Sequence, residues 1–144
     1  MKPKRVDGGV YLTLSTDFLF SAGSTGIYLQ EAQKSLLDTC LGYINSFNGS
    51  VSLNGHSDNV PIRSPIFPSN YELTGYRTSF FLRYMLSNGL DYESGNVSTL
   101  FWGDRLPYKA LDFTEMPNPE QIDILNKTPE DRADNRRIDI YFYY

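Results

Sequence analysis

The hydrophobic period changes several times along the chain, and these changes restrict the folds that it can adopt. Val10, Leu12 and Leu14 alternate with polar or aromatic neighbours, which is the period of a half-buried strand. Further on, apolar positions recur every three or four residues, as they do on one face of a helix. This stripe comprises Leu29, Ala32, Leu36, Cys40 and Tyr43, with Ser24 or Thr25 as the expected N-cap. A strand followed by a long helix is therefore predicted for this part of the chain.

The rest of the chain repeats this succession of strand and helix. Alternation predicts a short strand over 50–54, and the three prolines of the following loop exclude regular structure there. Thr74 is the expected N-cap of a second helix, which would place Arg77 in the first helical turn and end at Asn88 and Gly89. The predicted core-facing stripe of this helix is Thr74, Thr78, Phe81 and Met85.

Two more strands complete the predicted sheet, over 97–102 and 136–142. The order of elements is β-α-β-α-β-β, which favours an α+β fold: one mixed sheet with two long helices packed on one face. We expect a single domain over 1–144, with its core at about 10–143. The stretch between the last two strands is expected to be irregular, and 108–128 is predicted to be a surface excursion that the core can do without.

Composition excludes several classes of function. The formal net charge is −4 and no cluster of Lys and Arg exceeds KPKR near the N-terminus, so nucleic acid is not an expected partner. No apolar run approaches the roughly 18 residues that a membrane-spanning helix needs. The single cysteine, Cys40, falls on the buried stripe of the first helix, where we expect an inert thiol and no disulfide. No cofactor is expected.

The motif GHSDNVPI, at 55–62, raises the question of catalysis because it places the only histidine two residues before Asp58. His56 and Asp58 could begin a metal or acid–base site. A hydrolytic metal centre normally has three protein ligands, and the chain has no second histidine and no cysteine pair to supply them. We therefore expect that the protein is not an enzyme and that His56 is a structural residue bonded to backbone.

Four separated stretches of the chain form a set of motifs: LSTDFLFSAGSTGI, SLNGHSDNVPI, SNYELTGYR and DRADNRRIDIYF. Together they resemble the OmpA-like domain family, whose members hold peptidoglycan, and they are most similar to its MotB branch. LSTDFLFSAGSTGI resembles the opening strand and turn of the family, and SLNGHSDNVPI resembles its strand followed by Gly-His-Thr-Asp. SNYELTGYR resembles the Asn, Leu-Ser and Arg spacing, and DRADNRRIDIYF resembles the closing Asn-Arg-Arg strand. Departures from the pattern include Ser57 for threonine and Thr74 for serine.

The resemblance implies non-covalent binding of the diaminopimelate residue in the peptide stem of peptidoglycan, which anchors an envelope protein or machine to the cell wall. That ligand carries an ammonium and a carboxylate on one carbon, and the matching positions here are Asp58 for the ammonium and Arg77 for the carboxylate. Arg77 can present two parallel N–H donors. The further site residues that the resemblance implies are Asn70, Ser57, Asn59 and Arg136.

Each site residue also has a structural interpretation that the sequence leaves open. Asp58 could cap a turn, as aspartate often does in loops, and Arg77 could be an exposed helical arginine paired with Glu72 or Asp91. Asn135, Arg136 and Arg137 could be no more than the charged start of a strand.

The resemblance also implies a location and a set of partners. The expected location is the periplasm of a Gram-negative cell envelope, as part of a longer protein with a membrane or lipid anchor outside this chain. Peptidoglycan is the expected partner, and envelope-complex proteins could bind through 108–128, which mixes acidic and apolar residues. The alternative function is an OmpA-like interaction module of a secretion system or flagellar motor in which peptidoglycan binding is weak or lost.

Overall fold

The computed structural model describes residues 1–20, 30–91, 93 and 96–144, and its centre is one five-stranded sheet in the order β1-β2-β5-β3-β4. Strands β3 and β4 are parallel and the other neighbours are antiparallel. The strands are β1 (Lys2–Val6), β2 (Gly9–Ser15), β3 (Ser50–His56), β4 (Val97–Gly103) and β5 (Arg137–Tyr143). The predicted mixed α+β sheet is confirmed, and β1 is an edge strand that the sequence analysis missed.

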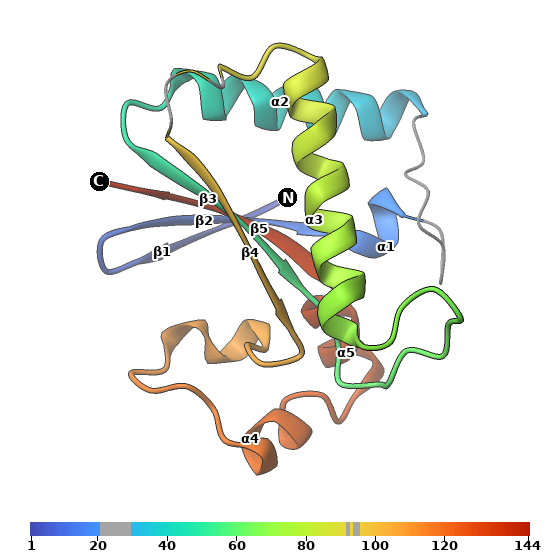
Figure 1. The fold of residues 1–144 in the computed structure, drawn as a ribbon. Helices are drawn as coiled ribbons and strands as arrows, with labels where there is room; N and C mark the ends of the chain where they lie inside the picture. The colour runs from blue at the N-terminus through green and yellow to red at the C-terminus, as the bar shows by residue number, and fades with distance from the viewer. Residues whose placement is uncertain (21–29, 92, 94–95) are drawn as a thin grey trace.

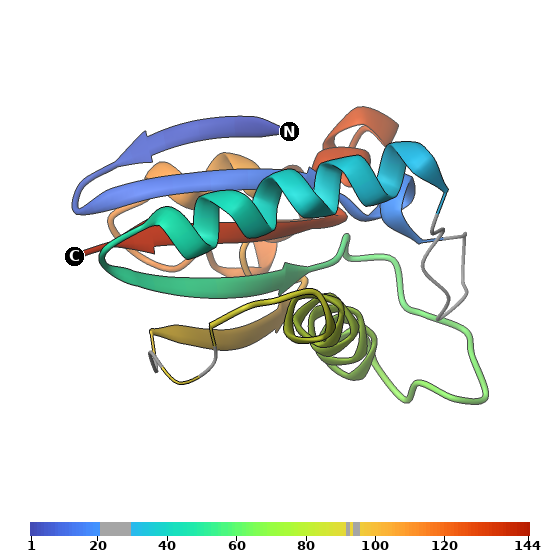
Figure 2. The ribbon, with the colours of Figure 1, turned by 90° about the horizontal axis from the view of Figure 1, so that it is seen from above.

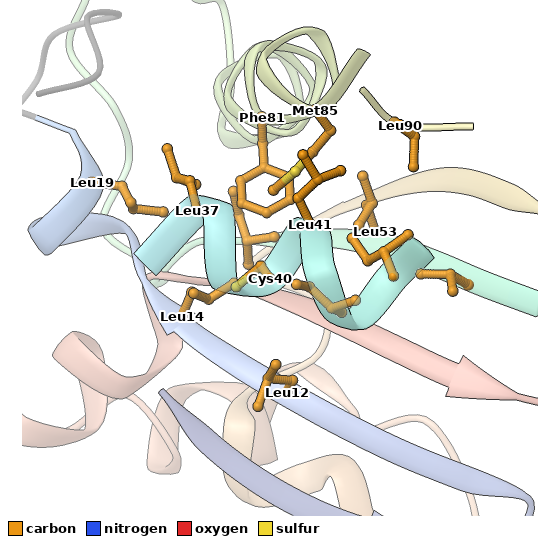
Figure 3. Packing of buried hydrophobic residues seen from close by; sticks show 14 of the residues in the cluster. Leu12, Leu14, Leu19, Leu37, Cys40, Leu41, Leu53, Phe81, Met85 and Leu90 are labelled. Atoms are coloured by element: carbon orange, nitrogen blue, oxygen red, sulfur yellow. The ribbon is translucent and has the colours of Figure 1, made fainter. Parts of the chain in front are cut away.

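Two long helices, α2 (Glu31–Ser46) and α3 (Asn70–Ser87), cover one face of the sheet. Their buried side chains join those of β2, β3 and β5 in one core cluster. Figure 2 shows α2 running alongside the strands and α3 end-on near β4. Phe81 and Met85 point from α3 towards Leu37 and Leu41 of α2 (Figure 3), so the two helices pack on each other as well as on the sheet.

The buried stripe of α2 differs from the prediction. It consists of Gln33, Leu37, Cys40, Leu41 and Ile44, so the helix is rotated relative to the predicted face. Tyr43 is 52% exposed, because Leu41 and Ile44 are the residues of this part of α2 that face the sheet. The N-cap proposed at Ser24 or Thr25 lies outside the described residues, and the N-cap that the structure describes is Gln30.

Helix α3 begins five residues earlier than predicted. Its N-cap is Ser69, whose hydroxyl accepts a hydrogen bond from the backbone N–H of Tyr71 at 3.2 Å. Thr74 is therefore inside the helix, and Arg77 lies in its third turn instead of its first, so free backbone N–H groups at the helix start do not act on Arg77. The core-facing stripe of Thr74, Thr78, Phe81 and Met85 is buried as predicted.

The segment between β4 and β5 contains more regular structure than its prolines suggested. It holds the 3-10 helix η1 (Tyr108–Asp112) and two short helices, α4 (Pro119–Ile124) and α5 (Pro129–Asn135). Pro119 and Pro129 each occupy the first helical turn, where proline is tolerated because its missing N–H has no intrahelical acceptor there. A further four-residue helix, α1 (Thr16–Leu19), follows β2.

Candidate functional site

The candidate site lies where β3 ends, next to the beginning of β5. In the antiparallel pairing of these two strands, His56 is opposite Arg137, so Asp58 and Arg136 come from adjacent strand ends. Helix α1 contributes Asp17 and α3 contributes Arg77. Figure 1 shows the end of β3 and the start of α3 at the same end of the molecule as α5.

Arg136 joins two carboxylates. Its Nη1 donates to Asp58 Oδ2 at 2.7 Å, and its Nε and Nη2 donate to the Asp17 carboxylate at 2.9 Å each. Hydrogen bonds from Arg136 to Asp17 and Asp58 raise the pKa of the Arg136 guanidinium, although its partial burial opposes this. Asp17 was not predicted as a site residue; the only signal was its place in the first family-like stretch, one residue before Phe18.

Arg77 lies beside this group and is only 9% exposed. Its guanidinium carbon is 5.2 Å from the centre of the Phe20 ring, and its buried Nε has no hydrogen-bond acceptor among the described residues. Burial lowers the pKa of Arg77, and the charge of Arg136 adds to that effect, while the carboxylates of Asp17 and Asp58 oppose it. Because Arg77 is buried, the alternative interpretation that it is an exposed helical arginine does not hold.

Asp58 is also 9% exposed, so both charged side chains of the predicted pair are buried. The carboxylate of Asp58 caps its own loop as well as binding Arg136, since Oδ1 accepts from the backbone N–H of Val60 at 3.0 Å. A carboxylate offers about four lone-pair positions, so these two bonds leave Asp58 with acceptor capacity.

The other three predicted residues, Ser57, Asn59 and Asn70, form hydrogen bonds that stabilise the loop containing Asp58. Asn70 donates to the backbone oxygens of Asp58 and Val60, at 3.3 and 3.1 Å. The Ser57 hydroxyl donates to the oxygen of Asp58 at 2.8 Å. Asn59 faces the segment before β5, where its side chain donates to Asp123 at 3.0 Å and its backbone N–H donates to Asn126 Oδ1 at 3.2 Å.

His56 lies on the opposite face of the sheet from the two long helices and is 2% exposed. Its Nε2 is 3.3 Å from Asp139 Oδ2, and its ring is parallel to that of Trp102 with 6.3 Å between their centres. Burial, aided by the charge of Arg137, lowers the pKa of His56 to about 4, although Asp139 opposes this shift. His56 is therefore neutral at pH 7. Within the described part of the chain, no three His, Cys, Asp or Glu side chains are grouped so as to hold a metal ion.

The site combines two guanidinium and two carboxylate groups. Arg136 is engaged by both carboxylates, whereas the Nε of Arg77 has no acceptor among its described neighbours. A ligand with a carboxylate and an ammonium close together matches this arrangement, because Arg77 can donate to the anion while Asp58 or Asp17 accepts from the cation.

No family model matches the chain. Its curated relatives from Bacillus subtilis (strain 168) include the uncharacterized protein YtxE, 27% identical, and motility protein B, 24% identical, each over 97% of this chain. The chain spans about half the length of both, 50% and 47%.

Solved structures share the fold along nearly the whole chain. The cell wall anchor of the type VI secretion system from Pseudomonas aeruginosa has a TM-score of 0.70 at 22% identity, covering 99% of this chain and 86% of that one. The periplasmic domain of Helicobacter pylori MotB, residues 97–256, has a TM-score of 0.73 at 22% identity, covering 99% and 88%. The OmpA-like domain of FopA1 from Francisella tularensis has a TM-score of 0.57 at 16% identity, covering 96% and 76%.

The fold is thus that of an OmpA-like domain. Within that class it is of the type found in the periplasmic part of MotB, and the resemblance seen in the sequence is confirmed. None of the helices described here is both long enough and apolar enough to cross a membrane.

Proposed function

We propose that this domain anchors an envelope protein to the cell wall by binding peptidoglycan without forming a covalent bond. The observation that carries the proposal is the buried guanidinium of Arg77, whose Nε has no acceptor among the described residues, beside two carboxylates that also hold Arg136. A diaminopimelate residue ends in an ammonium and a carboxylate on the same carbon, and this group of charges is complementary to both. The cell wall anchor of a secretion system and MotB, which share the fold, support the same role.

In the proposed complex the ligand carboxylate binds Arg77 and the ammonium binds Asp58, with Asp17 adding negative charge. Asn70, Ser57 and Asn59 keep the backbone of the Asp58 loop in place. Arg136 fixes the orientation of both carboxylates. Binding, not catalysis, is the proposed activity, and the domain acts on the periplasmic side of the envelope as part of a longer anchored protein.

The test is calorimetric titration with a soluble muropeptide that contains meso-diaminopimelate. Arg77→Ala should weaken binding by about 2–5 kcal/mol, because the ligand carboxylate loses a buried charged partner. Asp58→Asn should also weaken it, since it keeps the shape of the side chain and removes the charge. The matched control is Arg83→Ala, which removes an exposed arginine from the same helix and should leave the affinity unchanged.

A second ligand makes the test sharper. A muropeptide whose diaminopimelate carboxylate is amidated lacks the proposed partner of Arg77, so wild type should bind it weakly. Arg77→Ala should discriminate little between the two ligands. Equal affinities of wild type and Arg77→Ala for the carboxylate form, or no binding by wild type at millimolar concentration, would overturn the proposal.

The second candidate function is a protein-interaction module of an envelope machine. It is favoured by the surface of 108–128, where Phe113, Met116 and Ile124 are exposed among acidic residues. Under this alternative, a variant with all three changed to serine would lose its protein partner in a cross-linking experiment in cells and would keep its affinity for muropeptide.

A further inference from the structure

The residues on both sides of Arg136 are buried and held by several hydrogen bonds. Asn135 Oδ1 accepts from the backbone N–H of Tyr108 at 2.8 Å, and its Nδ2 donates to the oxygen of Leu125 and to Asn126 Oδ1 at 2.9 Å each. Arg137 follows and is 1% exposed. The backbone that carries Arg136 therefore has little freedom to move.

Arg137 belongs to a charged network on the face of the sheet opposite the two long helices. Its Nε donates to Asp139 Oδ2 at 2.8 Å, and its Nη2 donates to the oxygen of Leu106 at 3.0 Å. Asp139 Oδ1 accepts from the hydroxyl of Thr13 at 2.7 Å, and Nε2 of His56 lies 3.3 Å from Asp139 Oδ2. The network thus links β2, β5 and β3, the strands at whose ends the site is built.

This network is fully buried, which makes its geometry demanding. Asp139 has no exposed surface; burial alone would raise the pKa of its carboxyl, but Arg137, His56 and Thr13 together lower it. A buried charge pair is costly unless its hydrogen bonds are well formed, so small displacements of its members are strongly opposed. The side-chain bonds of Asp139 to Thr13 and Arg137 thus add to the backbone pairing that sets the register of β2, β5 and β3.

Residues of the network are adjacent, or nearly adjacent, in sequence to residues of the site. Arg137 directly follows Arg136, and His56 precedes Asp58 by two residues, while Arg137 and His56 are themselves cross-strand partners. We therefore expect a change in the separation of these partners to alter the separation of Asp58 and Arg136.

We propose that Thr13, His56, Arg137 and Asp139 are positioning residues for the wall-binding site. They do not touch the ligand. They hold the ends of β3 and β5 so that Arg136 orients Asp58 and Asp17 towards the ligand beside Arg77. This inference rests on the proposed function for the ligand, but the orientation of Arg136 can be measured without one.

The experiment compares Asp139→Asn and Thr13→Val with wild type in two measurements. The first is the ¹⁵N–¹H NMR signal of the Arg136 Nε–H group, which reports its bond to Asp17 in the free protein. The second is titration with the diaminopimelate muropeptide. We expect both variants to shift or broaden the Arg136 signal, and Asp139→Asn to weaken binding about tenfold, as loss of a supporting shell does at other sites. Thr13→Val, which keeps the charge pair and the side-chain shape, serves if Asp139→Asn does not fold.

Two controls separate positioning from general stability. Thr13→Ser keeps the hydroxyl that Thr13→Val removes, and should therefore keep the wild-type signal and affinity. Met85→Ala lowers stability in the core between the helices and the sheet, on the face opposite the network, and should leave both unchanged. An unchanged Arg136 signal in Thr13→Val, or equal loss of affinity in Met85→Ala at matched stability, would overturn the positioning role. If wild type fails to bind but the Arg136 signal responds as expected, the proposed function is lost and the positioning role stands.

Discussion

At the scale of single residues, the position of Arg77 determines how its charge is used. A guanidinium in the first turn of a helix would share an anion with free backbone N–H groups, but Arg77 lies further along α3, in a buried setting. Its contribution to the proposed binding would then come from its own donors and from the low local polarity, which strengthens charge-assisted bonds. That is why its replacement is expected to have a larger effect than replacement of an exposed arginine.

Cys40 should be unreactive in the folded protein. It has no exposed surface, and burial raises the pKa of its thiol to about 11, so almost no thiolate is present at pH 8. We expect an aromatic disulfide reagent to label it in urea and not under native conditions. As a control, Thr39→Cys in a Cys40→Ala background places a thiol on the exposed side of α2 and should be labelled at once. Rapid native labelling of wild type would show that α2 opens readily.

His56 should make folding stability depend on mildly acidic pH. In the unfolded state His56 binds a proton near pH 6.5, whereas in the folded state it does so only near pH 4. The contribution of neutral His56 to the free energy of unfolding is therefore fully present above pH 6.5 and is lost as the pH falls towards 4. The loss between pH 7.5 and pH 5 should be about 2 kcal/mol. Urea unfolding at these two values checks this. His56→Gln should show a smaller fall over the same range, and an identical fall would assign the effect to other groups.

At the scale of elements, Gly55 allows α3 to approach β3. A Cβ at this position would overlap the Thr78 hydroxyl and lie 2.9 Å from the backbone oxygen of Thr74. Gly55→Ala should therefore push α3 away and cost about 1–3 kcal/mol of stability. Because Arg77 lies between Thr74 and Thr78, the affinity for muropeptide should fall as well.

The control for Gly55→Ala is Gly42→Ala. A Cβ at Gly42, in the middle of α2, would have no atom within 4 Å, and alanine favours the helix by about 0.5–1 kcal/mol. Thermal melts of both variants give the comparison. A Gly55→Ala protein as stable as wild type would mean that α3 can shift without cost.

At the scale of the whole molecule, 108–128 remains predicted to be a surface excursion, and the structure divides it into parts with different contacts. Residues 112–116 are exposed, while Ala110, Ile122 and Asn126 are buried. Replacing 113–116 by two glycines should leave the melting temperature nearly unchanged. Removing all of 108–128 should lower it, because Asn126 and Tyr108 hold the strand ends of the site. If the protein without 108–128 melted at the same temperature as wild type, the whole excursion would be dispensable, as the sequence analysis expected.

The sequence by itself determined the order of the main elements and the class of fold. Hydrophobic periodicity reflects burial of one face of each element, which is a local property, and the four family-like stretches lie on those elements. It also indicated the buried stripe of α3, because Thr74, Thr78, Phe81 and Met85 recur at the helical period. The exposure of Tyr43 was not predicted because two neighbouring stripes of α2 are nearly equally apolar. Only the position of the sheet relative to the helix decides which stripe is buried.

The tertiary structure decided which charged groups meet. Arg136 binds Asp58, 78 residues away, and Asp17, 119 residues away, and no local pattern relates these positions. The pairing follows from where β3, β5 and α1 end in space. The same is true of His56, which is the most prominent residue of GHSDNVPI in the sequence. Its role depends on a strand pairing that turns its side chain to the opposite face of the sheet, next to Asp139, because successive residues of a strand point to opposite sides.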